Sequence, residues 1–266
     1  MTCDSWDNQS RFFDSHPDYQ CCVFDNRGVG RSSTPSCRYT TSDMAKDVYE
    51  LLIWLGWKSD IHLVGISMGG MISLELAHFS PEMFTSLTLV STTAGLTIPP
   101  VTAMIEIPRL LVIKDRGERL QRVLRLIFPQ SVLEAPPPAH SSPEYKNMFE
   151  YMFETSRRKA EAYPPQNPIG ALAQLSAVMT HHVSSTRLKQ IGDAMKGRIQ
   201  IVTGTWDQLV RPSNSTYLSK QLSCTMHVYE GGGHALPSER PAWFNDLLVS
   251  HFGQCARLVQ SMDSAL

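Results

Sequence analysis

The stretch Gly65-Ile66-Ser67-Met68-Gly69-Gly70 predicts the fold of this chain, because it places a serine between glycines in the pattern G-x-S-x-G. An apolar run at 61–65 precedes it, and a helical pattern at 71–79 follows it and ends before Pro81. A turn from strand to helix holds such a serine at the carboxyl end of the strand, close to the free N–H groups of the helix. Because the turn is strained, we expect glycine to be required on both sides of Ser67. The bare motif also occurs by chance, so the prediction depends on whether other residues can act together with Ser67.

Two polar residues further along the chain are candidate partners for Ser67. A serine hydroxyl is a weak nucleophile unless a base accepts its proton and a third group orients that base. Asp207 follows the predicted strand 198–203, and His234 follows the predicted strand 225–229. Alone, the aspartate could be a turn cap and the histidine a surface residue. Their order and their places after strands predict a triad, with the backbone N–H of Met68 as a donor to the oxyanion.

Strands and helices alternate along the chain, which is typical of a mostly parallel sheet with helices on both faces. The predicted strands are 21–24, 61–65, 87–90, 198–203 and 225–229. The predicted helices outside the middle of the chain are 43–55, 71–79, 213–222 and 241–252. We expect a single α/β domain over residues 1–266.

The middle of the chain, about 95–190, has a different character. It contains three helical patterns separated by proline clusters, and no convincing strand after Ile98. We interpret it as a helical insertion that covers the site, not as an independent domain. Its apolar residues either line part of a pocket or form the core of the insertion: Met148, Phe149, Tyr151, Met152 and Phe153.

Composition excludes several classes of function. The chain has 266 residues, 42% hydrophobic and 18% charged, with a net charge of −1, so no broad field attracts nucleic acid or an anionic membrane. Its six cysteines form no C-x-x-C pair, and the adjacent His181 and His182 cannot share one helix face as metal ligands, so packing or solvent contact is favoured. The N-terminus lacks an apolar signal segment, and no run reaches the ~20 residues of a membrane helix. We therefore expect a cytoplasmic protein without metal or cofactor.

In combination, these motifs resemble the α/β-hydrolase superfamily, in the branch of small esterases and enol-lactonases. The stretch from Phe24 to Ser33 is similar to that branch's D-x-R-G-x-G-x-S turn, and the stretches around Ser67, Asp207 and His234 match its other landmarks. The resemblance implies an α/β-hydrolase fold with a helical cap, and a serine hydrolase of carboxylic esters or lactones that needs no cofactor. The serine argues against the related epoxide hydrolases and haloalkane dehalogenases, which use an aspartate. A dinucleotide site is disfavoured because Ser33 stands where the third glycine would be.

The chain departs from the family pattern at its start. No His-Gly pair of an oxyanion loop occurs, and Trp6 resembles the helix that follows that loop. The chain would then be N-terminally truncated, without the strand that lies between those at 21–24 and 61–65 in the family. We expect either a gap in the sheet or direct pairing of these two strands. The loss of an oxyanion donor motivates an alternative function, that of an impaired or non-catalytic binding protein or fragment.

Overall fold

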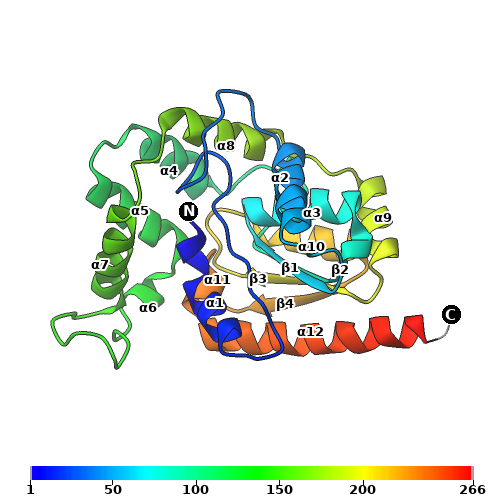
Figure 1. Cartoon of the computed structure of the whole chain (residues 1–266). Coiled ribbons are helices and arrows are strands. Elements are labelled where there is room, and N and C mark those ends of the chain that lie inside the picture. The colour runs from blue at the N-terminus through cyan, green and yellow to red at the C-terminus, as the bar shows by residue number, and fades with distance from the viewer. Residues whose placement is uncertain (1, 265–266) are drawn as a thin grey trace.

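A parallel sheet of four strands lies at the centre of the computed structural model, which describes residues 2–264 (Figure 1). The strand order β1-β2-β3-β4 follows the order along the chain, and each strand pairs in parallel with the next. The strands are β1 (Ile61–Ile66), β2 (Phe84–Val90), β3 (Ile199–Gly204) and β4 (Thr225–Tyr229). In register, Leu87 of β2 lies between Leu63 of β1 and Ile199 of β3. The carboxyl ends of all four strands therefore meet at one edge, where loops can bring distant residues together.

Helices cover both faces of this sheet, because successive side chains of a strand point to opposite faces. Leu87 and Leu89 of β2 pack in one core with helices α2 (Thr41–Trp54), α3 (Met68–Phe79), α9 (Ser185–Ala194) and α10 (Pro212–Leu222). Val90 of β2 and Val202 of β3 pack in a second core with α1 (Asp7–Asp14) and α12 (Pro241–Asp263). The predicted parallel sheet flanked by helices is confirmed.

The predicted strand at 21–24 is wrong. Residues 19–26 form neither strand nor helix. The ring of Tyr19 packs against the rings of His62 and Phe252, at centroid distances of 6.2 and 5.9 Å, on the face of the sheet that α12 covers. Tyr19 and Cys21 thus pack against the core on the α12 side of the sheet, and residues 21–24 join no strand. The direct pairing of residues 21–24 with β1 does not occur, and among the described residues β1 has β2 as its one strand neighbour.

Helices fill the stretch between β2 and β3, as the sequence predicts. Before α9, they are α4 (Val101–Val112), α5 (Arg116–Ile127), α6 (Gln130–Leu133), α7 (Met148–Glu161) and α8 (Pro168–Thr180). The stretch leaves and rejoins the sheet at one point, because Gly95 and His182 form an antiparallel bridge and the Val183 N–H donates to the Ala94 carbonyl at 2.8 Å. We call residues 96–181 the helical segment.

The helical segment has a small core of its own. Phe149, Met152 and Phe153 of α7 pack against a buried cluster that includes Leu124 and Phe128. Of the two roles that the sequence leaves open, the structure shows core packing for these three, and Phe149 and Phe153 also line a hollow along α7.

Several helix boundaries differ from the predicted ones for local reasons. Helix α2 begins before the predicted residue 43, because Thr40 is its N-cap, with the Thr40 hydroxyl accepting the Asp43 N–H at 3.1 Å. Helix α5 begins at Arg116, where the Asp115 carboxylate accepts the Glu118 N–H at 2.6 Å. The sequence does not predict α4, since Pro108 stands inside it. Helix α12 runs to 263 instead of 252.

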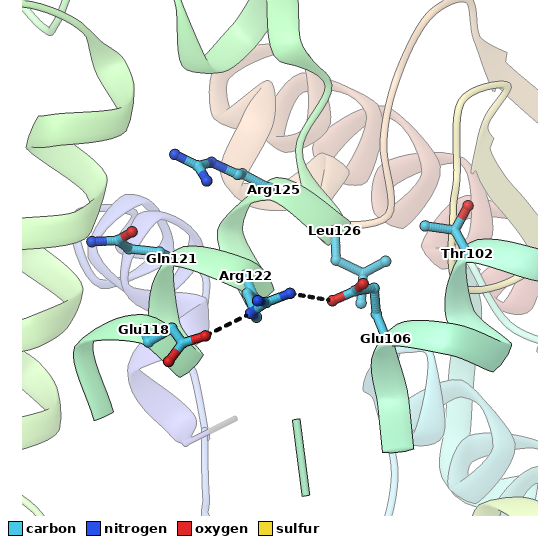
Figure 2. Close-up of a pocket in the computed structure, with 7 residues that line it drawn as sticks. All are labelled: Thr102, Glu106, Glu118, Gln121, Arg122, Arg125 and Leu126. Atoms are coloured by element: carbon cyan, nitrogen blue, oxygen red, sulfur yellow. Dashed lines mark hydrogen bonds and ion pairs between the residues drawn. The ribbon is translucent and has the colours of Figure 1, made fainter. Parts of the chain in front are cut away.

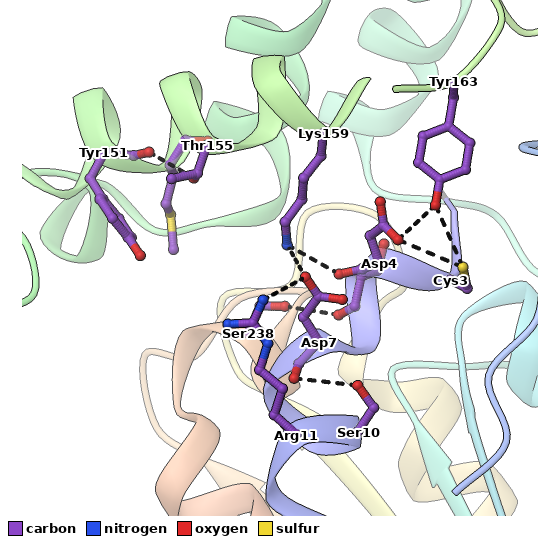
Figure 3. Close-up of polar contacts among 12 residues, drawn as sticks. Cys3, Asp4, Asp7, Ser10, Arg11, Tyr151, Thr155, Lys159, Tyr163 and Ser238 are labelled. Carbon is purple, nitrogen blue, oxygen red and sulfur yellow. Dashed lines mark hydrogen bonds and ion pairs between the residues drawn. The ribbon is translucent and has the colours of Figure 1, made fainter. Parts of the chain in front are cut away.

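The N-terminal residues contact the helical segment through polar side chains (Figure 3). Lys159 Nζ of α7 lies 2.5 Å from Asp7 Oδ2 of α1, and the Tyr163 hydroxyl donates to Asp4 Oδ1 at 2.7 Å. Asp4 belongs to the short 3₁₀ helix η1 (Cys3–Trp6), which begins the predicted helical region around Trp6. These contacts join two parts of the chain that are more than 150 residues apart.

The sequence predicts packing or solvent contact for His181 and His182, and each histidine has one of these two roles. His181 is buried, with Nδ1 at 2.8 Å from the Thr41 hydroxyl, whereas His182 is exposed. Close to His181, the buried carboxylate of Glu75 forms an ion pair with Arg187 at 2.5 Å. Burial lowers the pKa of His181 to about 4, so this histidine is neutral at pH 7.

Candidate active site

Ser67 lies in the sharp turn that joins β1 to α3. Its backbone has φ 53° and ψ −122°, a conformation that is strained for a residue with a side chain. Three main-chain bonds hold it there: the Ser67 N–H donates to Val90 at 2.9 Å, and the Ser67 carbonyl accepts from Met71 N–H at 3.1 Å and from the Thr92 hydroxyl at 2.7 Å. The Ser67 side chain makes no capping bond to α3. The hydroxyl is therefore not used to start the helix.

The glycines around Ser67 have unequal roles. A Cβ on Gly65 would lie 2.4 Å from Ser73 Oγ and 2.5 Å from the Gly69 carbonyl oxygen, so strand and helix approach too closely for a side chain. A Cβ on Gly70 would lie 2.7 Å from Thr92. At Gly69 nothing lies within 4 Å. The prediction that both flanking glycines are required is thus correct for Gly65 and wrong for Gly69, where the turn is open.

Asp207 and His234 are brought together, as the sequence predicts. Nδ1 of His234 lies 2.8 Å from Oδ2 of Asp207, and their side chains are 1% and 0% exposed. The other carboxylate oxygen, Oδ1 of Asp207, accepts the N–H groups of Leu209 and Val210 at 2.8 and 2.9 Å. The loop after β3 therefore orients the carboxylate, and the carboxylate orients the imidazole. With a proton on Nδ1, the Nε2 of His234 is left as the basic nitrogen.

Ser67 stands at the same carboxyl edge of the sheet, after β1, whereas Asp207 follows β3 and His234 follows β4. Among the residues that the structure describes, Ser67 Oγ forms no hydrogen bond with His234. The Met68 N–H is the first of helix α3, and the first four N–H groups of a helix have no acceptor within it. No acidic residue occupies the first turn of α3, so the positive end of its dipole is uncompensated there.

Two hollows open in the helical segment, away from these residues. A cavity of about 490 Å³ lies between α4 and α5 (Figure 2), lined by Thr102, Glu106, Glu118, Gln121, Arg122, Arg125 and Leu126. In this cavity, Arg122 forms ion pairs with Glu118 and Glu106, at 3.1 and 3.4 Å. A second hollow of about 440 Å³ runs along α7 and includes Phe149 and Phe153. Neither hollow is lined by Ser67, Asp207 or His234.

The sequence does not reveal two residues that contact His234 and the loop before it. The Ile127 carbonyl at the end of α5 accepts the His234 N–H at 3.0 Å, and Glu239 Oε2 accepts the Gly233 N–H at 2.8 Å. Ile127 belongs to an ordinary amphipathic helix, so nothing in its pattern marks it. Glu239 has a weak signal, as the one acidic side chain between His234 and Pro241.

Within residues 2–264, no three His, Cys, Asp or Glu side chains gather as they would around a metal ion. In the same range, no helix has the length and apolar character needed to cross a membrane.

Comparison with known proteins decides the family. Residues 2–241 match the family model described as the alpha/beta hydrolase fold. The chain belongs to this family. The α/β-hydrolase fold predicted from the motifs around Ser67 and His234 is thereby confirmed.

Individual members of the α/β-hydrolase family share part or most of this chain. The poly(3-hydroxyalkanoate) depolymerase of Ectopseudomonas oleovorans is 36% identical over 84 residues, which are 32% of this chain and 29% of the depolymerase. The RutD protein of Caulobacter vibrioides, described as a candidate carbamate hydrolase, is 29% identical over 234 residues, which are 86% of this chain and 78% of RutD. The crystal structure of a hydrolase from Pseudomonas aeruginosa has a TM-score of 0.72 at 24% identity, covering 95% of this chain and 86% of that one.

Proposed function

We propose that this α/β-hydrolase family protein hydrolyses carboxylic esters or lactones, with Ser67, His234 and Asp207 as its catalytic triad. The observation that carries the proposal is the buried contact of 2.8 Å between His234 Nδ1 and Asp207 Oδ2, at the edge of the sheet where Ser67 stands. This contact leaves Nε2 as a base, and a base is what an unactivated serine hydroxyl lacks. The strained backbone of Ser67, with its hydroxyl unused by α3, supports a role as nucleophile.

The proposed reaction proceeds in two halves. Ser67 Oγ attacks the ester carbonyl carbon while His234 Nε2 takes the hydroxyl proton, and the negative charge moves to the carbonyl oxygen, where the Met68 N–H donates to it. As the carbonyl re-forms, the bond to the leaving alcohol breaks and His234 returns the proton to that alcohol. Water then attacks the acyl carbon and loses a proton to Nε2. The bond between the acyl carbon and Ser67 Oγ then breaks, the acid is released, and the proton returns from Nε2 to Ser67 Oγ.

The helical segment is proposed to act as a cap over this site within a single domain. It leaves and rejoins the sheet at Gly95 and His182, directly after the β2 strand that lies beside Ser67's own. Its α4 and α5 contact both polar loops: the Thr102 hydroxyl donates to Gln208, next to Asp207, at 2.9 Å, and Ile127 accepts from His234. A substrate that reaches the triad would pass these helices.

A fluorophosphonate probe tests the proposal, because it modifies only an activated serine. We expect labelling of the wild-type protein at Ser67, together with hydrolysis of a short p-nitrophenyl ester. Ser67→Ala should abolish both, whereas the control Ser219→Ala, a partly exposed serine on α10, should change neither. Labelling at another serine would remove Ser67 from the site. No labelling of a folded wild-type protein would favour the non-catalytic alternative.

A further inference from the structure

Three consecutive glycines, 231–233, precede His234, and glycine loses more conformational freedom on folding than any other residue. Such a loop does not hold a side chain in place by its own stiffness. Four hydrogen bonds anchor its main chain from outside, of which the first joins the Gly231 N–H to the Thr205 hydroxyl at 2.8 Å. The Gly232 carbonyl accepts the Trp206 N–H at 2.9 Å, the Gly233 N–H donates to Glu239 Oε2 at 2.8 Å, and the His234 N–H donates to the Ile127 carbonyl at 3.0 Å.

The glycines also allow these anchors to approach closely. A Cβ on Gly233 would lie 2.5 Å from the Ile127 carbonyl oxygen and 3.2 Å from Glu239 Oε2. Glu239 belongs to the short helix α11 (Leu236–Glu239), so its side chain reaches back over one turn to the loop. Two of the four anchors are formed by side chains, Thr205 on Gly231 and Glu239 on Gly233. Glu239 holds the residue directly before His234, and a substitution can remove this anchor directly.

The surroundings of Glu239 are unfavourable for a carboxylate. Its side chain is 1% exposed. Within the described residues, Oε1 has no hydrogen-bond partner, and the nearest cation is Arg240 Nε at 3.7 Å. Burial raises the pKa of Glu239, against the hydrogen bond from Gly233, which lowers it. Because burying a polar group with an unsatisfied atom costs free energy, Glu239 is a poor choice for stability alone.

We propose that Glu239 is a positioning residue for His234: its Oε2 holds the Gly233 N–H, and thereby fixes the main chain from which the imidazole reaches Asp207. The inference rests on the proposed function, since it assigns Glu239 a role in the same site. Glu239 does not contact the imidazole, and acts through the backbone of the preceding residue. The length of the side chain is what matters, because the acceptor oxygen must reach a main-chain N–H on another loop.

Three substitutions of Glu239 distinguish the effect of side-chain length from the effect of charge. Glu239→Gln keeps an acceptor oxygen at the same length without the charge. Glu239→Asp keeps the charge, but its shorter side chain withdraws the oxygen from Gly233. Glu239→Leu removes the acceptor and fills the same space with an apolar group. Glu50→Leu, at an exposed position on α2, is the matched control.

Two readouts report on His234. The first is kcat and KM for a p-nitrophenyl ester. The second needs no turnover: the low-field proton NMR signal of the Nδ1–H that His234 shares with Asp207. For Glu239→Leu and Glu239→Asp we expect kcat to fall by up to about 10²-fold with KM little changed, and the NMR signal to broaden or vanish. Glu239→Gln should restore most of kcat and the signal, and Glu50→Leu should resemble the wild type.

Thermal unfolding distinguishes positioning from a merely structural role. Loss of kcat in Glu239→Leu without a lower Tm supports positioning, because removal of a buried carboxyl need not destabilise the protein. If Glu239→Leu does not fold, the Gln and Asp variants decide. Wild-type kcat and an unchanged NMR signal in Glu239→Asp or a folded Glu239→Leu would overturn the inference. A wild-type protein that shows the NMR signal but no hydrolysis would instead refute the proposed function, while the signal still tests Glu239.

Discussion

A Cβ on Gly204 would lie 2.2 Å from the carbonyl oxygen of Gly232. The loop that carries Asp207 and the loop that carries His234 thus meet main chain to main chain, and the Trp206 N–H donates to this same carbonyl at 2.9 Å. Side chains at this crossing would push the two loops apart. The distance of 2.8 Å between Asp207 and His234 therefore depends on a glycine three residues before the aspartate.

Gly204→Ala should destabilise the protein and impair the site together. We expect a loss of about 1–3 kcal/mol in the free energy of unfolding, as for other overpacked positions, and a fall in kcat larger than the loss of folded protein explains. Urea unfolding and ester hydrolysis measure the two effects. The control is Gly253→Ala on α12, where the nearest atom to a new Cβ is 3.5 Å away and alanine should stabilise the helix by up to about 1 kcal/mol. Unchanged unfolding in Gly204→Ala would show that the loops can separate freely.

The two glycines of the G-x-S-x-G motif should respond differently to alanine. Gly65→Ala places a methyl group 2.4 Å from Ser73 Oγ, so we expect strand and helix to be forced apart and probe labelling of Ser67 to be lost. Gly69→Ala meets nothing within 4 Å, and should leave folding intact or stabilise it by about 0.4–1 kcal/mol. Thermal unfolding of both variants is the measurement. Equal Tm values for the two would contradict the structure of this turn.

The candidate site residues carry a clearer sequence signal than the residues that hold them in place. Ser67, Asp207 and His234 each carry a local signal, because strained turns after strands need glycine and place polar residues at one edge. Ile127 carries no signal, because it contributes only a carbonyl oxygen, and Glu239 carries a weak one, because it accepts a main-chain N–H. Any residue type has a carbonyl group, so sequence cannot mark that kind of contact.

The predicted strand at 21–24 fails for a different reason. Apolar character indicates that a segment packs against the core, and Cys21 does pack against the second core. It does not indicate whether the segment also pairs with a strand of the sheet. That choice depends on neighbours that are distant in sequence, here the contacts of Tyr19 with His62 and Phe252. Strand pairing is a non-local property that local patterns do not determine.

Asp207→Asn should change the tautomer of His234 without disturbing the packing around residue 207. The amide oxygen of asparagine can still accept the N–H groups of Leu209 and Val210, while its NH₂ group faces Nδ1 of His234. Nδ1 then becomes an acceptor and the proton moves to Nε2, which can no longer take the proton of Ser67. We expect kcat to fall by up to about 10⁴-fold with little change in Tm.

The matched control for this variant is Asp193→Asn, at an exposed position of α9, which should behave as the wild type. A loss of kcat below about tenfold in Asp207→Asn would show that another carboxylate orients His234.

Acid should destabilise this protein through two buried histidines and one half-buried histidine. Burial lowers the pKa of His62, His181 and His251 from the ordinary 6.5 to about 4. Between pH 6.5 and about 4 the unfolded chain therefore binds protons that the folded chain does not. Stability is then fully present above the ordinary pKa and falls as the pH drops towards the folded pKa, with a slope of up to about 1.4 kcal/mol per pH unit for each histidine.

His181→Gln should flatten this dependence. Its amide can bond the Thr41 hydroxyl, as Nδ1 of His181 does at 2.8 Å, but it cannot be protonated. The free energy of unfolding is measured in urea from about pH 7 to about pH 5. We expect its slope against pH to fall by up to the contribution of one proton, about 1.4 kcal/mol per pH unit. The adjacent, exposed His182→Gln is the matched control and should leave the slope unchanged. Equal slopes for His181→Gln and the wild type would mean that His181 is protonated in the folded protein over this range. The carboxylate of Glu75, which lies close to His181 and pairs with Arg187, would then be the group that stabilises the protonated imidazole.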